Sequence, residues 1–347
     1  MRFETLRFDS GVLHILDQRK LPEEIEYFEA RTYKDVEFAI ADMVVRGAPA
    51  IGAVAAYGVY LAAEEYKDLT RQEFLTRLRA ANKELAAARP TAVNLMWAIG
   101  RMERLIDQGH DAEKISAALL KEAEAIARED VETNRAMARH GNALVPQGAT
   151  ILTHCNTGAL ATVGWGTALG VIREAHYSGK KIKVYANETR PRLQGANLTA
   201  FELVEDGIPA TLIVDSAAAT LIRDGKIDLI LVGADRIAAN GDTANKIGTF
   251  MLSELARRFN VPFYVVAPLS TIDFSIPDGS HIVIEERAAE ELTHIRGVPV
   301  APQGIAVYNP AFDITPHANI RGIITQQGIL TPRGGKLDAE NLINRRE

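Results

Sequence analysis

Short apolar runs alternate with helical segments through the C-terminal half of the chain, and this rhythm constrains the fold more than any other feature. Each run has the length of one strand and is nearly all apolar, as expected when both faces of a sheet are covered. Such alternation favours a parallel sheet with covering helices. The expected strands span residues 150–153, 182–186, 210–214, 229–232, 263–267 and 281–284. The expected helices begin near residues 164, 195, 216 and 243.

The N-terminal part of the chain has a different pattern, in which a small β element precedes a helical region. Residues 3–17 are expected to form a hairpin around the turn Asp9-Ser-Gly. The stretch 141–148, which contains Pro146, is expected to be the junction with the alternating region. We therefore predict an α/β protein with an N-terminal β-hairpin plus helical domain and a Rossmann-like parallel α/β domain. Their expected ranges are 1–145 and 146–347.

Helix signals recur between residue 32 and about residue 144. Thr32-x-x-Asp35 has the form of a capping box for a helix that runs to Val45, and Thr70-x-x-Glu73 has the form of a second one. Helical spacing of apolar residues further along predicts one buried stripe. Its members are Ile115, Leu119, Ala123 and Ile126.

Composition narrows the class of protein. The chain has 347 residues, 47% hydrophobic and 24% charged, which is enough for two globular cores. A net charge of −6 argues against a nucleic-acid-binding protein, although one pocket can still be basic enough for a phosphorylated ligand. The single cysteine excludes an internal disulfide and favours a reducing cytoplasm. Neither a signal peptide nor an apolar run of membrane-spanning length is expected, so no membrane partner is predicted.

The single cysteine, Cys155, lies where an apolar run breaks into Asn156-Thr-Gly. In an α/β protein this is the profile of a buried strand, a turn at its carboxyl end and a helix, and ligands tend to bind at that edge of the sheet. A lone cysteine is commonly a small buried side chain, but this position makes it a candidate site residue. His154 beside it suggests a Cys–His pair, yet neighbouring residues of a strand point to opposite faces, which disfavours direct pairing.

Polar clusters follow two further expected strands. One contains Pro191 between two arginines and then Gln194; the other contains Asp235 and, near an expected helix start, Asn245 and Lys246. Taken singly, each Arg or Lys is explained as a solvated charge, and Asp235 as a helix cap or a residue that bonds within a loop. Because the carboxyl ends of parallel strands meet at one edge, we expect the clusters to line one crevice. Helix-start amides and the Lys246 ammonium would then bind a phosphate together.

The segment Arg46-Gly-Ala-Pro-Ala-Ile-Gly lies between two apolar helical stretches. Pro49 suits the first turn of a helix, and Gly47 and Ala48 leave the preceding backbone uncrowded, so the helix start can face an anion beside Arg46. The alternative is a plain turn between helices. Arg89-Pro-Thr is a second break, which alone indicates only a loop. Neither a His-Glu-x-x-His zinc motif nor a Gly-x-Gly-x-x-Gly after a strand is present, so no metal or nucleotide cofactor is expected.

Four motifs resemble those of the methylthioribose-1-phosphate isomerases, the aldose–ketose isomerases of methionine salvage. The resemblance extends from about residue 10 to residue 330. The same superfamily contains ribose-1,5-bisphosphate isomerase and regulatory subunits of a eukaryotic translation-initiation exchange factor. The motifs are Arg46-Gly-Ala-Pro-Ala-Ile-Gly, Thr153-His-Cys-Asn-Thr-Gly-Ala-Leu-Ala-Thr, Glu188-Thr-Arg-Pro-Arg-Leu-Gln-Gly and Gly233-Ala-Asp-Arg-Ile-Ala-Ala-Asn-Gly-Asp-Thr-Ala-Asn-Lys-Ile-Gly.

This resemblance implies specific roles. Cys155 and Asp235 are implied to be the catalytic pair, acting on a small phosphorylated sugar without metal or nicotinamide, in a homodimer. The residues implied to hold the substrate are Arg46, Gly47, Ala48, Arg89, Gln194, Asn245 and Lys246.

Two alternatives stay open from the sequence. One is a related sugar-1-phosphate isomerase, for ribose 1,5-bisphosphate or a 5-deoxypentose 1-phosphate, which would differ in the pocket for the 5-substituent. The other is a non-catalytic regulatory subunit that senses a phosphorylated metabolite. The presence of both Cys155 and Asp235 argues against the second alternative, because a sensor needs neither an acid nor a base.

Overall fold

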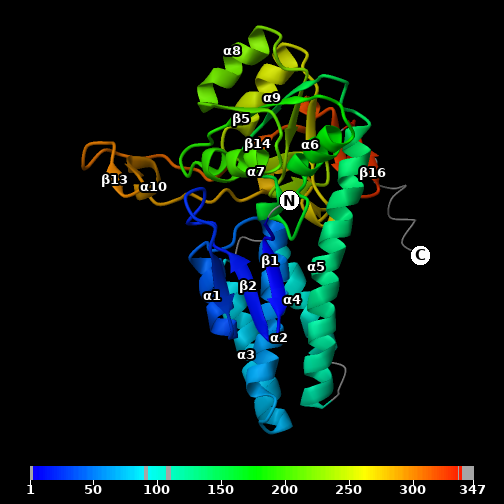
Figure 1. Ribbon diagram of the computed structural model, residues 1–347, viewed down its shortest axis with the longest axis vertical. Helices are drawn as coiled ribbons and strands as arrows, with labels where there is room; N and C mark the ends of the chain where they lie inside the picture. The colour runs from blue at the N-terminus through cyan, green and yellow to red at the C-terminus, as the bar shows by residue number, and fades with distance from the viewer. Residues whose placement is uncertain (1–2, 90–92, 107–110, 335, 338–347) are drawn as a thin grey trace. The chain divides into compact units, whose positions relative to one another are not determined.

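The computed structural model describes residues 3–89, 93–106, 111–334 and 336–337 (Figure 1). Packing separates the chain into two compact units. Unit 1 comprises Met1–Asn134 and Gly158–Gly166, and unit 2 comprises Arg135–Thr157 and Thr167–Glu347. The segment after Cys155 therefore belongs to unit 1 by packing, although the sequence on both sides of it belongs to unit 2. The two domains expected from the sequence, 1–145 and 146–347, stay a proposal.

Unit 1 begins with a three-stranded antiparallel sheet. Strand β1 (Leu6–Asp9) pairs with β2 (Val12–Leu16), as the sequence predicted, and β2 also pairs with β3 (Tyr27–Ala30), which was not predicted. Ser10 and Gly11 have φ values of 50° and 80°. Positive φ at both positions matches the right-handed twist of the two strands, which explains the tight turn.

Five helices follow: α1 (Tyr33–Ala41), α2 (Ala48–Tyr66), α3 (Arg71–Ala87), α4 (Val93–Ile106) and α5 (Ala112–Asn142). The capping boxes predicted at Thr32 and Thr70 both form. The expectation that the first helix reaches Val45 is wrong, because Met43 adopts a φ of 61° and the chain leaves the helix. Val44 and Val45 are instead buried in the core, where the Val44 carbonyl accepts a hydrogen bond from Gln18 N.

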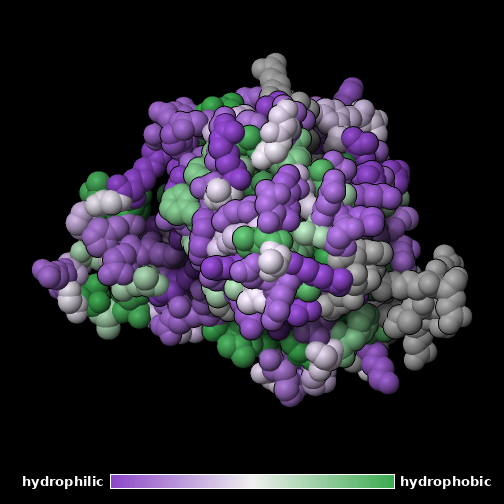
Figure 2. All heavy atoms as spheres, turned by 90° about the horizontal axis from the view of Figure 1, so that it is seen from below, coloured by the Kyte–Doolittle hydropathy of each residue, from purple (hydrophilic) through white to green (hydrophobic). Residues whose placement is uncertain are grey.

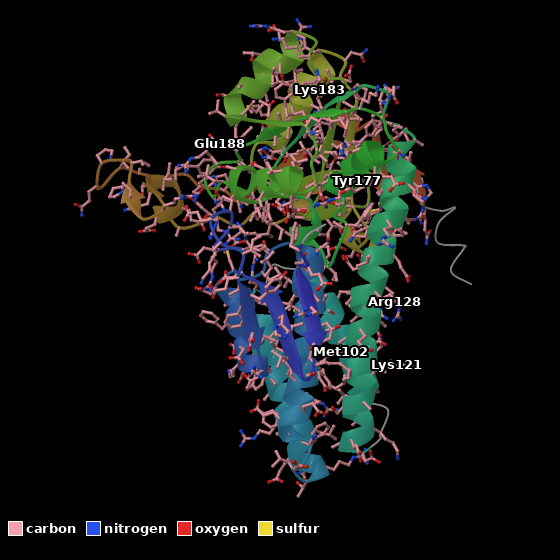
Figure 3. All side chains as sticks on the ribbon, viewed as in Figure 1. Met102, Lys121, Arg128, Tyr177, Lys183 and Glu188 are labelled. Atoms are coloured by element: carbon pink, nitrogen blue, oxygen red, sulfur yellow. The ribbon has the colours of Figure 1, made fainter. Side chains whose placement is uncertain are left out.

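The core of unit 1 surrounds α2, which is buried over most of its length and packs against α1, α3 and α4. The stripe predicted on α5 is confirmed, since Ile115, Leu119, Ala123 and Ile126 are all buried. Lys121 and Arg128 lie on the other side of α5 and point outward, whereas Met102 of α4 is fully buried (Figure 3). Unit 1 is thus a helical layer stabilised mainly by apolar burial.

Unit 2 is built on a seven-stranded sheet with the order β16-β15-β10-β7-β4-β5-β6. The strands predicted in the first five ranges are confirmed, and neighbouring strands from β15 to β6 run parallel. Their bounds are β4 (Thr150–Thr153), β5 (Lys183–Asn187), β6 (Ala210–Ile213), β7 (Leu229–Val232), β10 (Phe263–Val266), β15 (Gly322–Thr325) and β16 (Gly328–Leu330).

Alternate residues of the central strands point to opposite faces of this sheet. Ile151, Leu229 and Leu231 share a buried cluster with α6 (Ala168–Tyr177) and α7 (Ala200–Glu205). On the other face, Leu152 and Ile230 share a cluster with α8 (Ala218–Arg223) and α9 (Thr249–Arg258). Helices thus cover both faces, as Figure 1 shows for unit 2, and this explains why the strands are apolar throughout.

The strand predicted at 281–284 is wrong. Residues Gly279–His281 form the short helix η5, capped by Asp278, and no strand follows directly. Val283 is 91% exposed, whereas Ile282 is buried against Ala238 and Ala244 of another sheet, so the apolar run packs on strands without forming one. The remaining sheet positions are taken by β15 and β16, which lie further along the chain.

Helix starts are close to expectation in three places and wrong in the fourth. Helix α6 begins at Ala168, α7 follows the π-helical turn η2 (Gly195–Thr199), and α8 follows η3 (Asp215–Ala217). Residues Thr243–Lys246 form strand β9 instead of a helix start, because they pair with β14, a partner far along the chain that local periodicity does not reveal.

Strand β9 belongs to a second sheet of unit 2, with the order β11-β8-β9-β14. Its other strands are β8 (Arg236–Ala238), β11 (Ile272–Asp273) and β14 (Phe312–Thr315). Smaller elements complete the unit: η1 (Ala159–Ala161, in the segment assigned to unit 1), η4 (Leu269–Thr271), α10 (Glu290–Thr293), β12 (His294–Ile295), β13 (Val298–Pro299), η6 (His317–Asn319), β17 (Pro332–Arg333) and β18 (Lys336–Leu337).

Hydrophilic residues cover most of the face drawn in Figure 2, and apolar residues are scattered over it in small groups. None of the described helices combines the length and the hydropathy that a membrane-spanning helix needs.

Candidate active site at the switch point of the sheet

The order of strands reverses at one point in the seven-stranded sheet. Strands β4, β5 and β6 progress toward one edge, whereas β7, β10 and β15 progress toward the other. The reversal falls between β4 and β7, which pair in parallel with Ile151 opposite Leu229. Open α/β sheets bind ligands outside the carboxyl ends of the strands at such a switch point. Cys155 follows β4 and Asp235 follows β7, so the two residues come from the two strands that flank it.

Cys155 has an unusual backbone conformation, with a φ of 60°. Its N–H donates to Thr189 Oγ1 at 2.9 Å, and its carbonyl accepts from Thr199 Oγ1 at 2.6 Å. A left-handed conformation is costly for a residue with a side chain and persists where surrounding contacts determine it. The two threonine hydroxyls supply such contacts, and they leave the thiol of this half-buried residue on a fixed turn.

Asp235 lies just beyond β7, where its N–H donates to Ala244 O at 2.9 Å and its side chain is partly exposed. The end of β7 packs directly on the turn after β4. A Cβ placed on Gly233 would lie 3.0 Å from Thr157 Cγ2, so any larger residue would press on the Thr157 side chain. The turns that carry Cys155 and Asp235 are therefore held side by side.

His154 does not pair with Cys155. Its buried ring directs Nε2 to Ile247 O at 2.8 Å and Nδ1 to Asn187 Nδ2 at 3.0 Å. Because a carbonyl oxygen only accepts, Nε2 carries the hydrogen, and Nδ1 accepts from the amide. Burial lowers the pKa of His154, in agreement with this neutral form.

The loop after β5 is held by Asp215 near its start and by Glu291 at Arg192. Near its start, Thr189 N and Arg190 N both donate to the Asp215 carboxylate at 2.8 Å. Near its end, Gln194 is 8% exposed, and its buried Oε1 accepts no hydrogen bond from any residue within the described ranges. Such an oxygen favours a polar ligand at this position. Arg192 forms an ion pair with Glu291 of α10 at 2.7 Å, so this arginine is used within the fold.

Asn245 and Lys246 both lie on β9 and not at the start of a helix. Asn245 Nδ2 donates to Thr249 Oγ1 at 3.0 Å, while Lys246 Nζ donates to Ala311 O at 3.0 Å and lies 4.7 Å from the centre of the Phe312 ring. These contacts place both side chains on one strand next to the α9 start, in unit 2 with Cys155, Asp235 and Gln194.

The amides at the start of α9 have a partner from the chain itself. Gly248 N and Phe250 N donate to the two carboxylate oxygens of Asp313 at 2.7 and 3.0 Å. The expectation that these amides are open to a phosphate beside Lys246 is therefore wrong. Burial raises the pKa of Asp313 to about 6, although the two amides act in the opposite direction.

The remaining predicted residues belong to unit 1. Gly47 precedes α2 with a φ of 95°, and a Cβ there would lie 2.2 Å from Ala161 O, so only glycine fits against this backbone. Ala48 begins α2 and Pro49 is in its first turn, as predicted. Arg46 and Arg89 are half-buried; Pro90 and Thr91 lie outside the described residues. The joint action of these residues with those of unit 2 on one substrate stays a prediction.

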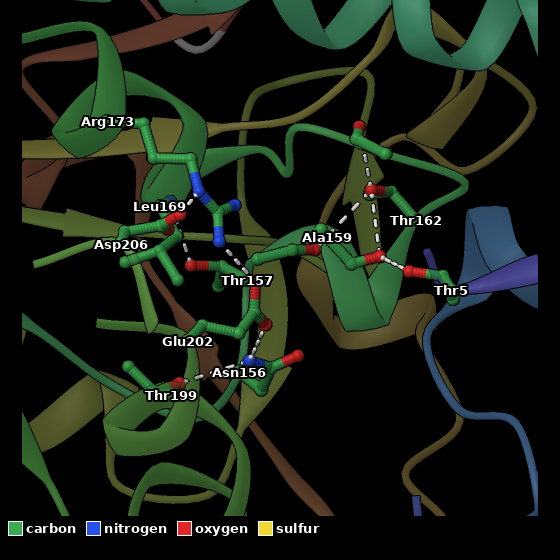
Figure 4. A network of polar contacts seen from close by, with 12 residues as sticks. Thr5, Asn156, Thr157, Ala159, Thr162, Leu169, Arg173, Thr199, Glu202 and Asp206 are labelled. Carbon is green, nitrogen blue, oxygen red and sulfur yellow. Dashed lines mark hydrogen bonds and ion pairs between the residues drawn. The ribbon is translucent and has the colours of Figure 1, made fainter. Parts of the chain in front are cut away.

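A buried charged network behind the turn was missed by the sequence analysis (Figure 4). Arg173 of α6 bonds to Glu202 at 2.6 Å and to Asp206 at 2.5 Å, and all three side chains are completely buried. Glu202 also accepts from Asn156 Nδ2 at 2.8 Å, and Asn156 donates to Thr199 Oγ1 as well. An arginine inside an apolar helical stretch was the available signal, since buried cations need acidic partners.

Across the described residues, no group of three or more His, Cys, Asp or Glu side chains is arranged to hold a metal ion.

The fold and the site together define a class of protein: a helical unit joined to a Rossmann-type α/β unit with polar residues at its switch point. The family model of the initiation factor 2 subunit family matches residues 44–332. The chain belongs to this family.

Individual relatives are similar over nearly the whole chain. A methylthioribose-1-phosphate isomerase of Caldanaerobacter subterraneus subsp. tengcongensis is 66% identical over 331 residues, which cover 95% of this chain and 96% of the relative. The solved structure of 5-methylthioribose 1-phosphate isomerase from Pyrococcus horikoshii has 46% identity, a TM-score of 0.90 and coverage of 95% and 92%. A structure from A. fulgidus described as translation initiation factor eIF-2B, subunit delta, has 45% identity, a TM-score of 0.86 and coverage of 95% and 96%.

Proposed function

We propose that this protein is an aldose–ketose isomerase of methionine salvage, which converts 5-methylthioribose 1-phosphate into 5-methylthioribulose 1-phosphate. The observation that carries the proposal is the 66% identity to an isomerase of that name across almost the full length of both chains. Its chemical support is the position of Cys155 and Asp235 after the two strands that flank the switch point.

The substrate poses a particular chemical problem. An ordinary aldose isomerase acts on the open-chain aldehyde, but a phosphate on the anomeric oxygen prevents spontaneous ring opening. The enzyme therefore has to assist cleavage of the bond between C1 and the ring oxygen. A proton then leaves the 2-position, either from carbon, giving an enolate, or from the hydroxyl while hydride moves from C2 to C1.

We assign the proton donor to Asp235. A carboxylic acid next to the ring oxygen protonates it as the C1–O bond breaks, provided that the closed site keeps the acid neutral. The hydrogen bond from Asp235 N to Ala244 O and the packing of Gly233 on Thr157 support this assignment, because they hold the backbone of Asp235 beside the turn that follows β4.

We assign the base to Cys155. A thiolate removes the proton from the 2-position in either route, and the turn that holds Cys155 limits its motion through the hydroxyls of Thr189 and Thr199. A site that excludes water suits both routes, because the cationic intermediate of ring opening is easily hydrolysed.

We assign substrate binding to the residues that the family resemblance implies. The unsatisfied Oε1 of Gln194 supports a hydrogen bond from a sugar hydroxyl, and the ammonium of Lys246 supports a contact with the phosphate. Arg46, Gly47 and Ala48 at the α2 start supply cationic and amide donors to the anion, Arg89 supplies a further guanidinium, and Asn245 supplies an amide.

A regulatory, non-catalytic function is the second candidate. The eIF-2B name of the A. fulgidus structure, at 45% identity, favours it. Cys155 and Asp235 at the switch point favour the enzyme, because a protein that only senses a metabolite requires neither a base nor an acid there.

The test is to incubate the purified protein with 5-methylthioribose 1-phosphate, ribose 1,5-bisphosphate and a 5-deoxypentose 1-phosphate, and to follow each reaction by phosphorus NMR. The expected result is conversion of the first substrate, with the same rate after thorough chelation. A clear preference for ribose 1,5-bisphosphate would assign the chain to the related isomerase. Tight binding without turnover of any substrate would favour the regulatory function.

We also propose a homodimer in the cytoplasm. The family resemblance supports the dimer, and a composition with a single cysteine suits a reducing compartment. Sedimentation equilibrium at several concentrations tests the dimer, and a mass of one chain throughout would exclude it.

A further inference from the structure

One imidazole connects three segments of unit 2 that carry predicted site residues. His154 itself precedes Cys155. Its Nδ1 accepts from Asn187, the last residue of β5 and the start of the loop that leads to Gln194. Its Nε2 donates to Ile247 O, the carbonyl directly after Lys246. The ring is 1% exposed, so both bonds are shielded from water.

The surrounding backbone leaves little room for this ring to move. Gly248 has a φ of 103°, which favours glycine, and a Cβ on it would lie 3.1 Å from the imidazole Cε1, so the β9–α9 turn packs closely on the ring. Asn187 closes a second connection, because its carbonyl accepts from Thr189 Oγ1 at 3.1 Å, and the same hydroxyl accepts from Cys155 N. The hydrogen bonds therefore run from Ile247 through His154, Asn187 and Thr189 back to Cys155.

We propose that His154 is a positioning residue of the isomerase site, whose ring fixes the distance between the Cys155 turn and the Lys246 segment. The inference deepens the proposed function and rests on it. His154 contacts neither reacting atoms nor phosphate in this role. It acts through Ile247 on the segment that anchors the substrate, and through Asn187 on the turn that holds the base.

The competing interpretation is a core histidine that contributes only to stability. The two interpretations predict different effects when the hydrogen bond of one ring nitrogen is removed. A core residue would lower the stability of unit 2 whichever bond is removed. A positioning residue makes substrate binding and the behaviour of Cys155 depend on the bond to Ile247 in particular.

Two substitutions separate the ring nitrogens. In His154→Gln the side-chain amide reaches the position of Nε2 and continues to donate to Ile247 O. In His154→Asn the shorter amide reaches only the position of Nδ1, so the contact with Asn187 is kept and Ile247 O loses its donor. His176→Gln on α6 is the matched control, since it removes a half-buried imidazole of the same unit from outside these segments.

Two measurements are made on each folded variant. The first is kcat and KM for 5-methylthioribose 1-phosphate. The second is the rate of alkylation by iodoacetamide, which reports on Cys155 alone because the chain has a single cysteine. We expect His154→Asn to lose roughly tenfold or more in kcat/KM, mainly through KM, and to change the alkylation rate severalfold. His154→Gln and His176→Gln should stay near the wild type in both.

Equal effects of the Asn and Gln variants on alkylation, or no effect of either, would overturn the proposal. If the wild type has no isomerase activity but alkylation still separates Asn from Gln, the positioning role stands and the proposed function fails. If His154→Asn does not fold, Gly248→Ala replaces it, because the added methyl group presses on the ring and, at a φ of 103°, also strains the turn that follows Ile247. A normal alkylation rate in folded Gly248→Ala would then overturn the proposal.

Discussion

The surroundings of α2 in unit 1 and those of the Cys155 turn in unit 2 bury mainly different kinds of side chains. Unit 1 surrounds α2 with an almost continuous apolar core, and its helices α1 and α3 begin where local capping boxes predict. Unit 2 buries Arg173, Glu202 and His154 beside the turn that carries Cys155. Apolar burial stabilises regular elements without specifying one loop geometry, whereas directional polar contacts determine where a single turn lies.

An exception in unit 1 supports this interpretation. Asp130 of α5 accepts hydrogen bonds from Val163 N at 2.8 Å and Asn134 Nδ2 at 2.9 Å. Val163 belongs to the irregular segment 158–166 that continues from the Cys155 turn. Buried acidic side chains therefore contact the segment 156–163 near both of its ends: Glu202 bonds to Asn156, and Asp130 bonds to Val163.

The largest effects are expected at the two proposed catalytic residues. Cys155→Ser replaces an ionisable thiol by a much weaker base, and Asp235→Asn removes the transferable proton. Each should slow turnover by roughly two to four orders of magnitude. The two losses should be far from additive, because the residues act as a unit.

Steady-state kinetics, calorimetric binding and melting temperature are measured together for these variants, with folding and substrate binding expected to survive. Near-normal turnover in Cys155→Ser would end the assignment of the base. A fall in melting temperature at normal turnover per folded molecule would show that Cys155 has a structural role. The polar contacts around its turn would then contribute to stability and not to catalysis.

The next prediction compares the stability cost of replacing two arginines, each of which forms ion pairs with two carboxylates. Arg173→Leu leaves Glu202 and Asp206 buried without a cation, which should lower the free energy of unfolding by roughly 3–5 kcal/mol. The matched control in unit 1 is Arg101→Leu. Its side chain is 19% exposed and pairs with Glu122 and Glu129 nearer to solvent, so a cost of about 1 kcal/mol is expected.

Urea unfolding, with the two variants and the wild type measured in parallel, checks this comparison. Equal costs for Arg173→Leu and Arg101→Leu would show that depth of burial does not distinguish the two networks, and the contrast between the units would be lost.

A smaller effect is expected for substrate anchoring. If Lys246 binds the substrate phosphate as proposed, Lys246→Ala removes charge-assisted hydrogen bonds worth roughly 1.5–3 kcal/mol, which corresponds to about a ten- to hundredfold loss in kcat/KM. Lys183→Ala is the control, because Lys183 is an exposed residue of β5 (Figure 3). If both variants retain the wild-type kcat/KM, Lys246 does not contact the phosphate.

The stability of the protein should depend on pH through the buried carboxyl group of Asp130 in unit 1. Part of the Asp130 residue is exposed, yet burial of its carboxyl group raises the pKa to about 7 from an ordinary 3.8. A raised folded-state pKa gives stability that is fully present below the unfolded pKa and is lost as pH rises through the folded one. Between pH 5 and pH 8, the unfolding free energy should therefore fall by about 2–3 kcal/mol more in the wild type than in Asp130→Asn. Parallel pH profiles for the two proteins would contradict this.

The smallest effect is expected at a helix cap of unit 1. Thr70→Ala removes the hydroxyl that accepts from Glu73 N, which should cost about 1 kcal/mol of stability with unchanged kcat/KM. Thr76→Ala is the control, because its hydroxyl bonds only within the exposed middle of α3. A loss of activity in Thr70→Ala would contradict this comparison, because it would show that a helix cap of unit 1 affects catalysis as well as stability.

The sequence by itself determined the local structure on both sides of this comparison. Capping boxes at Thr32 and Thr70 mark helix starts because the groups that satisfy each other are three residues apart. Strands β4 and β7 match the predicted ranges because residues buried on both faces are apolar without interruption. The polar residues after them were candidates because a strand end in such a sheet faces a ligand.

Only the tertiary structure decided contacts between distant residues. Thr243–Lys246 is a strand because β14 pairs with it, and the α9 amides are occupied because Asp313 lies on that same β14. His154 joins Asn187 to Ile247, and Arg173 joins Glu202 to Asp206, across separations that no local periodicity records. The local sequence does not specify which groups a polar side chain will bond to. Its donors and acceptors find their partners only when the fold brings distant residues together.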